Sequence, residues 1–485
     1  MKRKLTHVEN KHSIDEDLLG GSLTLTKLKD YFSGLSDLYF VEVQHDEPIL
    51  SFYCEGMIDH TQYNDYYHGV MKEIKGQETD TFDQDLIPPI IHIESLSTLI
   101  EKIFSGFLLF YKEGDSHFFG INIAKIPQRT PEESTTEVSI KGPKDSFTEE
   151  LHVNVSLIRK RLKSAHLYNE SFTIGSESQT KVSLLYLNNK INHEMIKEVR
   201  SRLITFQTEG IVSSGQLEQW LSDRSFTLFP LFDYITRPDF VVECMLRGRF
   251  IIIVNGSPSV LIGPINLFEL IKSPEDVHYP YFYVAFQRII RLTALLIAMF
   301  LPGFWIAISS VNIDQLPFPL LATVVIAREG LPFPYALEAL FILGLFELLK
   351  EAGVRMPKAL GQTISIVGGL IIGDAAIRAG LASPALIVVI ALSAVATYTL
   401  VNQSLTGTVS ILRIYCLGIS AFLGVYGFFI AVFSVLIYLC HLESFKVSYL
   451  EPISSLSFKE YLSALLIDPF KRRKFTAPML EKRRR

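Results

Sequence analysis

The stretch LTALLIAMFLPGFWIAISSV, residues 292–311, contains 20 residues and no charged side chain. Two further stretches without charge follow at 384–403 and 414–440. A helix rises about 1.5 Å per residue, so roughly 20 apolar residues span the hydrocarbon core of a bilayer. One such stretch could be the buried helix of a soluble protein, but three in succession favour membrane helices. We therefore predict an all-α, polytopic membrane domain over residues 285–442.

The two ends of the chain are polar and differ in charge. Residues 1–30 contain no apolar run typical of a signal peptide, so we predict a polar, disordered N-terminus in the cytoplasm. The C-terminal stretch KRRKFTAPMLEKRRR carries eight basic residues and one acidic residue. Basic clusters beside membrane helices favour the cytoplasmic side and contact anionic lipid headgroups. Residues 443–485 are thus predicted to form a basic cytoplasmic tail whose partner is membrane lipid and not nucleic acid.

The region before the first apolar stretch alternates strand-like and helix-like patterns, and their order recurs. ILSFYCEGMID at 49–59 predicts a strand and a turn, and an amphipathic helix follows. VSLLYLNNKIN at 182–192 is followed by the helix-like HEMIKEVRSRL in the same order. When the stretches that begin at Ile49 and Val182 are aligned without gaps, Asp59 corresponds to Asn192.

A second pair of similar segments follows the first. GFLLFYKEGDSHFFGINI begins at Gly106, and GRFIIIVNGSPSVLIGPINL begins at Gly248. Both predict a β-hairpin in which a glycine-containing turn joins two apolar strands. We therefore predict a cytoplasmic α/β region of two similar subdomains, at 31–130 and 151–284. Residues 131–150, rich in Pro, Thr, Ser and Glu, are predicted to be a linker.

No motif in the chain indicates catalysis. A phosphate-binding P-loop, a GxGxxG after a strand, a zinc-binding HExxH and a GxSxG nucleophile motif are all absent from the sequence. The four cysteines, at positions 54, 244, 416 and 440, do not have the spacing of metal ligands. We predict a protein that is not an enzyme and that binds no metal and no other cofactor.

Charged residues mark the borders of the predicted membrane domain. Arg288 and Arg291 precede the first apolar stretch on one helix face, which places them at the cytoplasmic membrane interface. Glu347 and Glu351, one helical turn apart, are predicted to lie at the same interface. Residues 316–327 are apolar but too few to cross a membrane, so they predict a re-entrant or interfacial helix.

Acidic and small residues inside the apolar domain are candidates for an ion path. Glu338 interrupts an apolar helix, and a carboxylate at that depth faces either a water-filled path or a paired structural contact. Asp374 is spaced i, i+4 from Arg378, so these two side chains could also neutralise each other. A stripe of small residues either packs closely against another helix or lines a conduit. Its members recur every four positions and are Gly361, Ser365, Gly369 and Gly373.

The number of membrane crossings follows from parity. Both ends of the chain are predicted to be cytoplasmic, so the number of crossings is even, either four or six. The residues that decide between these numbers are 361–380 and 411–441, of which the second stretch is either one tilted helix or a hairpin.

Several strings of the apolar domain closely resemble the A subunits of GerA-type spore germination receptors. They are SPEDVHYPYF at 273–282, FLPGFWIAISS at 300–310, AREGLPFPYALEAL at 327–340, and the block from FELLKEAGVRMPK to AIRAGLASP at 346–384. The string IKGPKDSFTEELHVNVSLIRKRL at 140–162 of the α/β region resembles the same family. The resemblance extends over roughly residues 40–470.

This resemblance implies a subunit of a nutrient-sensing receptor in the spore inner membrane, a multi-pass protein with both termini in the cytoplasm. The family's A subunit acts with a transporter-like B subunit, which binds the nutrient, and with a lipoprotein C subunit. It forms a homo-oligomer and an ion conduit that opens when germinant binds and releases monovalent cations. These properties are expectations from the family.

Two places depart from the family pattern, and two alternatives stay open. Val277 and His278 follow Asp276 where the family often has tyrosines, and Asp374 occupies a position often held by glutamine or a small residue. An acidic residue beside a conduit favours cations. The main alternative is a non-conducting scaffold or signal-transducing subunit. A secondary transporter has less support, because paired inverted broken helices are not evident.

Overall fold

The computed structural model describes residues 23–43, 48–75, 88–125, 141–224, 226–355 and 373–453. Contacts divide them into an α/β unit, 23–224 with 232–264, and a helical unit, 226–231 with 265–453. The predictions for residues 1–22, for the first part of the linker and for the basic tail beyond 453 lie outside the described residues. So do Gly361, Ser365 and Gly369 of the small-residue stripe.

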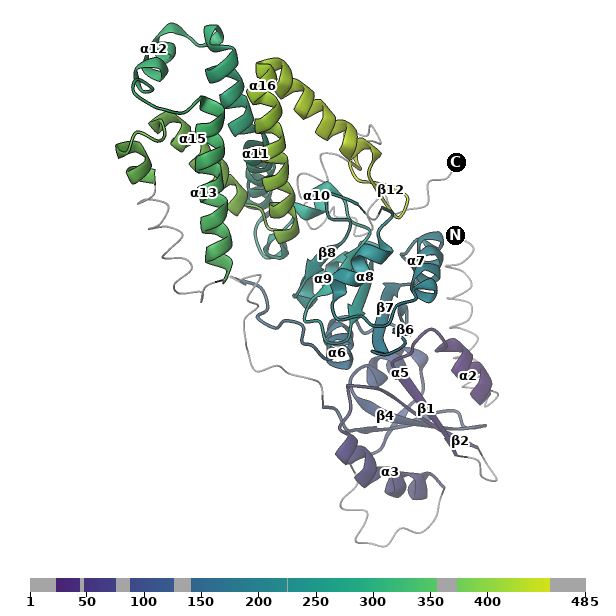
Figure 1. Cartoon of the computed structure of the whole chain (residues 1–485). Helices are drawn as coiled ribbons and strands as arrows, with labels where there is room; N and C mark the ends of the chain where they lie inside the picture. Colours follow the sequence, from purple (N-terminus) through teal and green to yellow (C-terminus); the bar gives the residue numbers. More distant parts are fainter. Residues whose placement is uncertain are drawn as a thin grey trace. The chain divides into compact units, whose positions relative to one another are not determined.

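The α/β unit contains two five-stranded antiparallel sheets with the same topology (Figure 1). The first has the order β1-β2-β4-β5-β3, formed by β1 (Leu38–Val43), β2 (Ile49–Cys54), β3 (Ile91–Ile93), β4 (Phe107–Lys112) and β5 (Phe118–Asn122). The second has the order β6-β7-β9-β10-β8, formed by β6 (Leu167–Ile174), β7 (Thr180–Leu187), β8 (Asp233–Ile235), β9 (Phe250–Val254) and β10 (Val260–Gly263).

Helices accompany each sheet in a matching order. The first subdomain has α2 (Leu25–Tyr31), α3 (His60–Ile74) and α5 (Leu96–Ile103). The second has α6 (Leu151–Arg161), α7 (His193–Thr205), α8 (Ser214–Leu221) and α9 (Pro238–Leu246). Strand β9, FIIIV, is buried along its whole length, which explains why its sequence is a continuous apolar run without alternation.

The internal repeat predicted from the sequence is confirmed down to single residues. Asp59 caps α3 by accepting a 3.0 Å hydrogen bond from the Thr61 N–H, and Asn192 caps α7 by accepting one of 3.0 Å from Glu194. Such side chains satisfy N–H groups that the first helical turn leaves free. The two hairpins also begin alike, because Gly106 and Gly248 have φ values of +86° and +94°.

The folded region begins earlier than the sequence indicated. Residues 1–30 were expected to be polar and disordered, yet α2 starts at Leu25. Thr24 caps this helix, and Leu25 and Leu28 are buried in the core of the first sheet. Two leucines spaced i, i+3 supply the apolar face that holds so short a helix in place.

Among the described residues, the helical unit contains six α-helices, from 4 to 39 residues long, followed by a small hairpin. Its elements are α10 (Leu267–Leu270), α11 (Tyr281–Ile306), α12 (Phe318–Ile326), α13 (Tyr335–Arg355), α15 (Pro384–Tyr398), α16 (Gln403–His441), β11 (Glu443–Ser444) and β12 (Val447–Ser448). Residues 265–284, expected at the end of the second α/β subdomain, belong to this unit. Asn266 Nδ2, for example, donates a 3.0 Å hydrogen bond to the Glu451 carbonyl.

Helix α16 bends sharply at Gly424, where φ is +62° and ψ is −142° (Figure 1). The hydroxyls of Tyr415 and Ser434, on opposite sides of the bend, lie 2.9 Å apart. In a straight helix a separation of 19 positions would place these residues about 28 Å apart. Of the two possibilities that the sequence left open, one tilted helix and a hairpin, the structure has the folded-back form.

Two helical stretches of the described residues are long and apolar enough to cross a membrane. They are Tyr281–Val311, which is α11 with the turn after it, and Gln403–His441, which is α16. Helix α15 is apolar but shorter. The nine-residue α12 occupies the place where the sequence predicted a segment too short to cross.

Candidate functional site

Arg288 and Arg291, predicted at the membrane border, hold the start of α11 against the turn before it. Arg288 Nε lies 2.8 Å from Asp276 Oδ2, and Arg291 Nη1 lies 3.0 Å from Asp276 Oδ1. Arg291 also donates to the Ile271 carbonyl at 3.1 Å. Asp276 is the aspartate of the SPEDV string, and it is buried. A buried carboxylate requires such charged partners, so this part of the string has a structural role.

Glu338 is fully buried in the first turn of α13. Its Oε1 accepts hydrogen bonds from the Ser383 backbone N–H at 2.5 Å and from the Ser383 hydroxyl at 2.7 Å. Ser383 precedes α15, so the carboxylate lies at the positive end of that helix. Of the two alternatives for Glu338, this geometry provides the paired structural contact. A role of Glu338 beside an ion path stays a prediction.

Arg328 is the basic partner of Glu338. Its Nη2 lies 3.7 Å from Glu338 Oε2 and donates a 2.9 Å hydrogen bond to the Phe333 carbonyl. The guanidinium also stacks over the Tyr335 ring, 3.6 Å from the ring centroid. Glu338 Oε2 accepts no hydrogen bond within the described part of the chain. One oxygen of this buried carboxylate is therefore held firmly, and the other only by a longer ionic contact.

Asp374 forms the i, i+4 ion pair that its spacing allowed. Its Oδ2 lies 2.7 Å from Arg378 Nε, and the two side chains are 57% and 78% exposed. Gly373 directly precedes it, in open surroundings where an added Cβ would have only Ile387 nearby, at 3.9 Å. The carboxylate is thus paired and also accessible within this chain.

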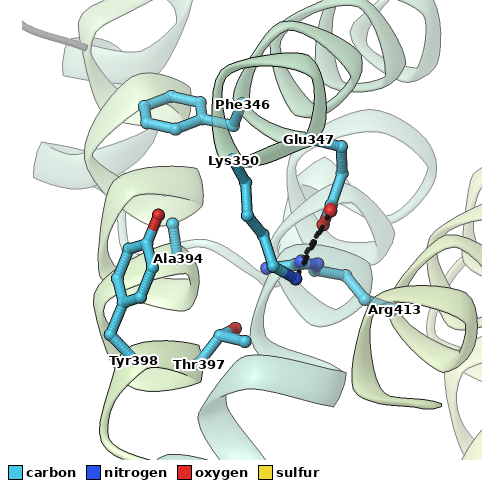
Figure 2. Close-up of a pocket in the computed structure, with 7 residues that line it drawn as sticks. All are labelled: Phe346, Glu347, Lys350, Ala394, Thr397, Tyr398 and Arg413. Carbon is cyan, nitrogen blue, oxygen red and sulfur yellow. Dashed lines mark hydrogen bonds and ion pairs between the residues drawn. The ribbon is translucent and has the colours of Figure 1, made fainter. Parts of the chain in front are cut away.

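Glu347 belongs to a partly buried charge cluster that no sequence pattern signalled (Figure 2). Arg413 of α16 is buried and its Nη2 lies 2.5 Å from Glu347 Oε1, while Lys350 Nζ lies 3.6 Å from Glu347 Oε2. Arg413 and Glu347 are 66 residues apart, so no local spacing signals the pair. Glu351, by contrast, is 63% exposed and pairs with Arg355 at 2.7 Å.

A small polar cavity lies between the two subdomains of the α/β unit. It has a volume of about 60 Å³, room for a few water-sized groups. Two of its buried polar atoms, Asn169 Oδ1 and Ser183 Oγ, have no hydrogen-bond partner among the described residues. At its edge His152 Nδ1 lies 3.1 Å from Glu55 Oε2. That hydrogen bond is the main cause that lowers the pKa of Glu55 and raises the pKa of His152.

In the portion of the chain that the structure describes, His, Cys, Asp and Glu side chains form no group of three or more that could hold a metal ion.

A family model described as Bacillus/Clostridium GerA spore germination protein matches residues 26–483. The chain belongs to the GerA family. This GerA-family chain is 41% identical over 433 residues to spore germination protein XA of Bacillus anthracis, covering 88% of each protein. It is 32% identical over 431 residues to the uncharacterized membrane protein YfkQ of Bacillus subtilis (strain 168), covering 87% of this chain and 83% of YfkQ.

A solved structure is also similar to this GerA-family chain. It is the N-terminal domain of the A subunit of the Bacillus megaterium spore germinant receptor GerK3. The two are 26% identical, with a TM-score of 0.38, and the match covers 50% of this chain and 92% of that domain.

Proposed function

We propose that this chain is the membrane-spanning A subunit of a nutrient-responsive spore germination receptor. In this proposal it acts with a transporter-like B subunit and a lipoprotein C subunit, assembles into a homo-oligomer and forms an ion conduit that opens on germinant sensing. Membership in the GerA family and two helices of membrane-spanning length support the receptor and membrane parts of the proposal. Multiple crossings and cytoplasmic termini are the topology that it requires.

The observation that carries the conduit part is the accessible carboxylate of Asp374. It directly follows Gly373, the last member of the small-residue stripe, and keeps 57% of its side chain exposed in spite of its pairing with Arg378. A negative charge beside a narrow path lowers the energy of a passing cation. Asp374 therefore contributes to cation selectivity.

Ion flux from liposomes that contain the purified full-length protein, with and without its B-type partner, tests this proposal. We expect cation flux that falls severalfold in Asp374→Asn. The matched control is Glu351→Gln, because Glu351 and Arg355 form a similarly exposed i, i+4 pair at the same 2.7 Å distance. Correct assembly without flux in either preparation contradicts the conduit and favours the scaffold. Flux coupled to nutrient uptake favours a transporter.

A second role, binding of a small polar molecule, is favoured by the cavity of the α/β unit. Asn169 Oδ1 and Ser183 Oγ are buried there without hydrogen-bond partners among the described residues, an arrangement that costs free energy unless a ligand or water completes it. Small amino acids, which match a cavity of about 60 Å³, are suitable probes for calorimetry on the full-length protein. Weaker binding in Ser183→Ala, with unchanged binding in the outward-facing Ser97→Ala, is the expected result; equal effects contradict this role.

A further inference from the structure

The charge cluster around Glu347 surrounds a small pocket at the meeting point of three helices (Figure 2). Helix α13 contributes Phe346, Glu347 and Lys350, and α16 contributes Arg413. The remaining wall is formed by the last residues of α15, including Thr397 and Tyr398. The pocket thus combines apolar walls with a concentration of charge.

The cluster has one positive charge more than it has negative charges. Arg413 and Lys350 carry two positive charges, and Glu347 supplies one negative charge, shared between them. Lys350 Nζ otherwise contacts the Ser410 hydroxyl at 3.2 Å, a neutral group. Arg413 is buried and Lys350 is 27% exposed, and a surplus charge with so little access to water is costly among apolar helices unless an opposite charge compensates it.

Arg413 has a guanidinium nitrogen without a hydrogen-bond partner among the described residues. The residue is 2% exposed, its Nη1 donates to the Ser393 hydroxyl at 3.0 Å, and its Nη2 donates to Glu347. Its Nε has no hydrogen-bond partner within the residues that the structure describes. A buried guanidinium N–H without an acceptor favours binding of an anionic oxygen.

The size of the pocket restricts what can enter it. Its volume is about 20 Å³, enough for one or two oxygen atoms but not for a whole metabolite. The anionic group therefore has to be the end of a larger molecule that remains outside. Tyr398, at the edge of the pocket, is 66% exposed, so this side is open.

An apolar face of α15 leads directly to the opening. Val388, Leu392 and Val395 are 66%, 50% and 60% exposed, and their i, i+4, i+7 spacing places them on one face. From Val388 to Tyr398 the helix rises about 15 Å, which is close to the length of a fatty acyl chain. A molecule with an anionic head and an apolar chain matches this arrangement.

We propose that the pocket binds the phosphate of an anionic phospholipid whose acyl chain lies along α15. One phosphate oxygen accepts from Arg413 Nε and another from Lys350 Nζ, and the charge of the headgroup neutralises the surplus of the cluster. Basic pockets between membrane helices are suited to phospholipid headgroups in this way. The site makes the packing of α13, α15 and α16 depend on the lipid.

The test is native mass spectrometry of the delipidated full-length protein, titrated with phosphatidylglycerol, phosphatidylcholine or inorganic phosphate. We expect saturable binding of phosphatidylglycerol that weakens about fivefold in Lys350→Gln. Arg355→Gln is the matched control: it removes the same charge from the same helix, but Arg355 is 78% exposed and does not line the pocket. The affinity of the Arg355→Gln variant for phosphatidylglycerol should remain within twofold of that of the unmodified protein.

Four results overturn the proposal. Equal weakening in Lys350→Gln and Arg355→Gln means that only the general surface charge attracts the lipid. Equal binding of phosphatidylglycerol and phosphatidylcholine, insensitive to Lys350→Gln, excludes an anionic headgroup site. Binding of inorganic phosphate alone, as tight as that of phosphatidylglycerol, assigns the site to free phosphate. Lys350→Arg keeps the charge and should bind as the unmodified protein does, so its failure to bind also contradicts the proposal.

Discussion

Arg159 of the second subdomain forms a bidentate ion pair with Asp37 of the first. Arg159 Nε lies 2.7 Å from Asp37 Oδ2, and Arg159 Nη2 lies 2.9 Å from Asp37 Oδ1. The arginine side chain is fully buried and also stacks over the Phe104 ring, 4.2 Å from its centroid. The pair therefore fixes the two sheets of the α/β unit to each other with a planar, directional contact.

Asp37→Ala should destabilise the α/β unit by about 3–5 kcal/mol, because it leaves the Arg159 guanidinium buried without its counter-charge. The free energy of unfolding, followed by hydrogen exchange of the amides in β6, measures this loss. Asp145→Ala is the control, since Asp145 pairs with Arg161 on the same helix α6 at a site where both side chains are partly exposed. Its cost should not exceed about 1 kcal/mol. Equal costs would show that the burial of the Asp37–Arg159 pair does not increase its contribution to stability.

The Glu55–His152 pair should make the stability of the α/β unit depend on pH. The raised pKa of His152 stabilises the fold below the ordinary value of 6.5, and this contribution is lost as the pH rises through the raised pKa. The lowered pKa of Glu55 stabilises the fold above 4.5, and this contribution is lost as the pH falls through the lowered pKa. The contribution of the pair is therefore largest between about pH 4.5 and 6.5.

The free energy of unfolding across this pH range, compared between the unmodified protein and His152→Gln, measures the contribution. The difference should reach at most about 1 kcal/mol, because the two side chains are 40% and 26% exposed. Glu55→Gln should remove the same contribution, and the double variant should lose no more than either single variant. Additive losses would mean that the two residues act independently.

The doubled sheet could be predicted because its signals are local. The residues that cap α3 and α7, Asp59 and Asn192, stand at equivalent places in two similar strings, and glycine opens each hairpin. Helix caps and left-handed turns depend on few neighbouring residues, so a pattern of composition and spacing reveals them. The same reasoning placed the long apolar helices, whose length alone distinguishes them.

The charge cluster of the helical unit could not be predicted in this way. Glu347 was placed at the membrane border, but its partner Arg413 lies 66 residues further along the chain, after another helix. Helix packing decides which charges meet, and no spacing rule covers such a distance. The partner of Glu338 was undetermined for the same reason, because Ser383 reaches it only through the packing of α15 against α13.

Glu338 should stabilise the helical unit chiefly as a hydrogen-bond acceptor. Glu338→Ala leaves the Ser383 N–H and hydroxyl without an acceptor at the start of α15, at a cost of about 1–3 kcal/mol. Glu338→Gln keeps an acceptor oxygen and loses only the 3.7 Å attraction to Arg328, so its cost should be smaller. Thermal unfolding of the full-length protein in detergent distinguishes the two variants. Equal losses would contradict this prediction and indicate that the charge of Glu338, through its contact with Arg328, is what stabilises the unit.

Gly424 should be the glycine of α16 that is least tolerant of substitution. Its φ of +62° is strained for any other residue, and an added Cβ would overlap Asn312 Oδ1 and contact Val311. The same Asn312 oxygen accepts a 2.9 Å hydrogen bond from the Val425 N–H and so holds the bend in place.

Gly424→Ala should therefore lower the stability of the helical unit by about 1–3 kcal/mol, because the bend must strain or Asn312 must move. Gly418→Ala is the matched control in the same helix: no atom lies within 4 Å of its added Cβ, and alanine favours helix over glycine. Its thermal unfolding should be unchanged or slightly higher. A crosslink between cysteines introduced at Tyr415 and Ser434 reports on the bend and should form less readily in Gly424→Ala. Unchanged crosslinking and unchanged stability in Gly424→Ala would contradict the assignment of the bend to this residue.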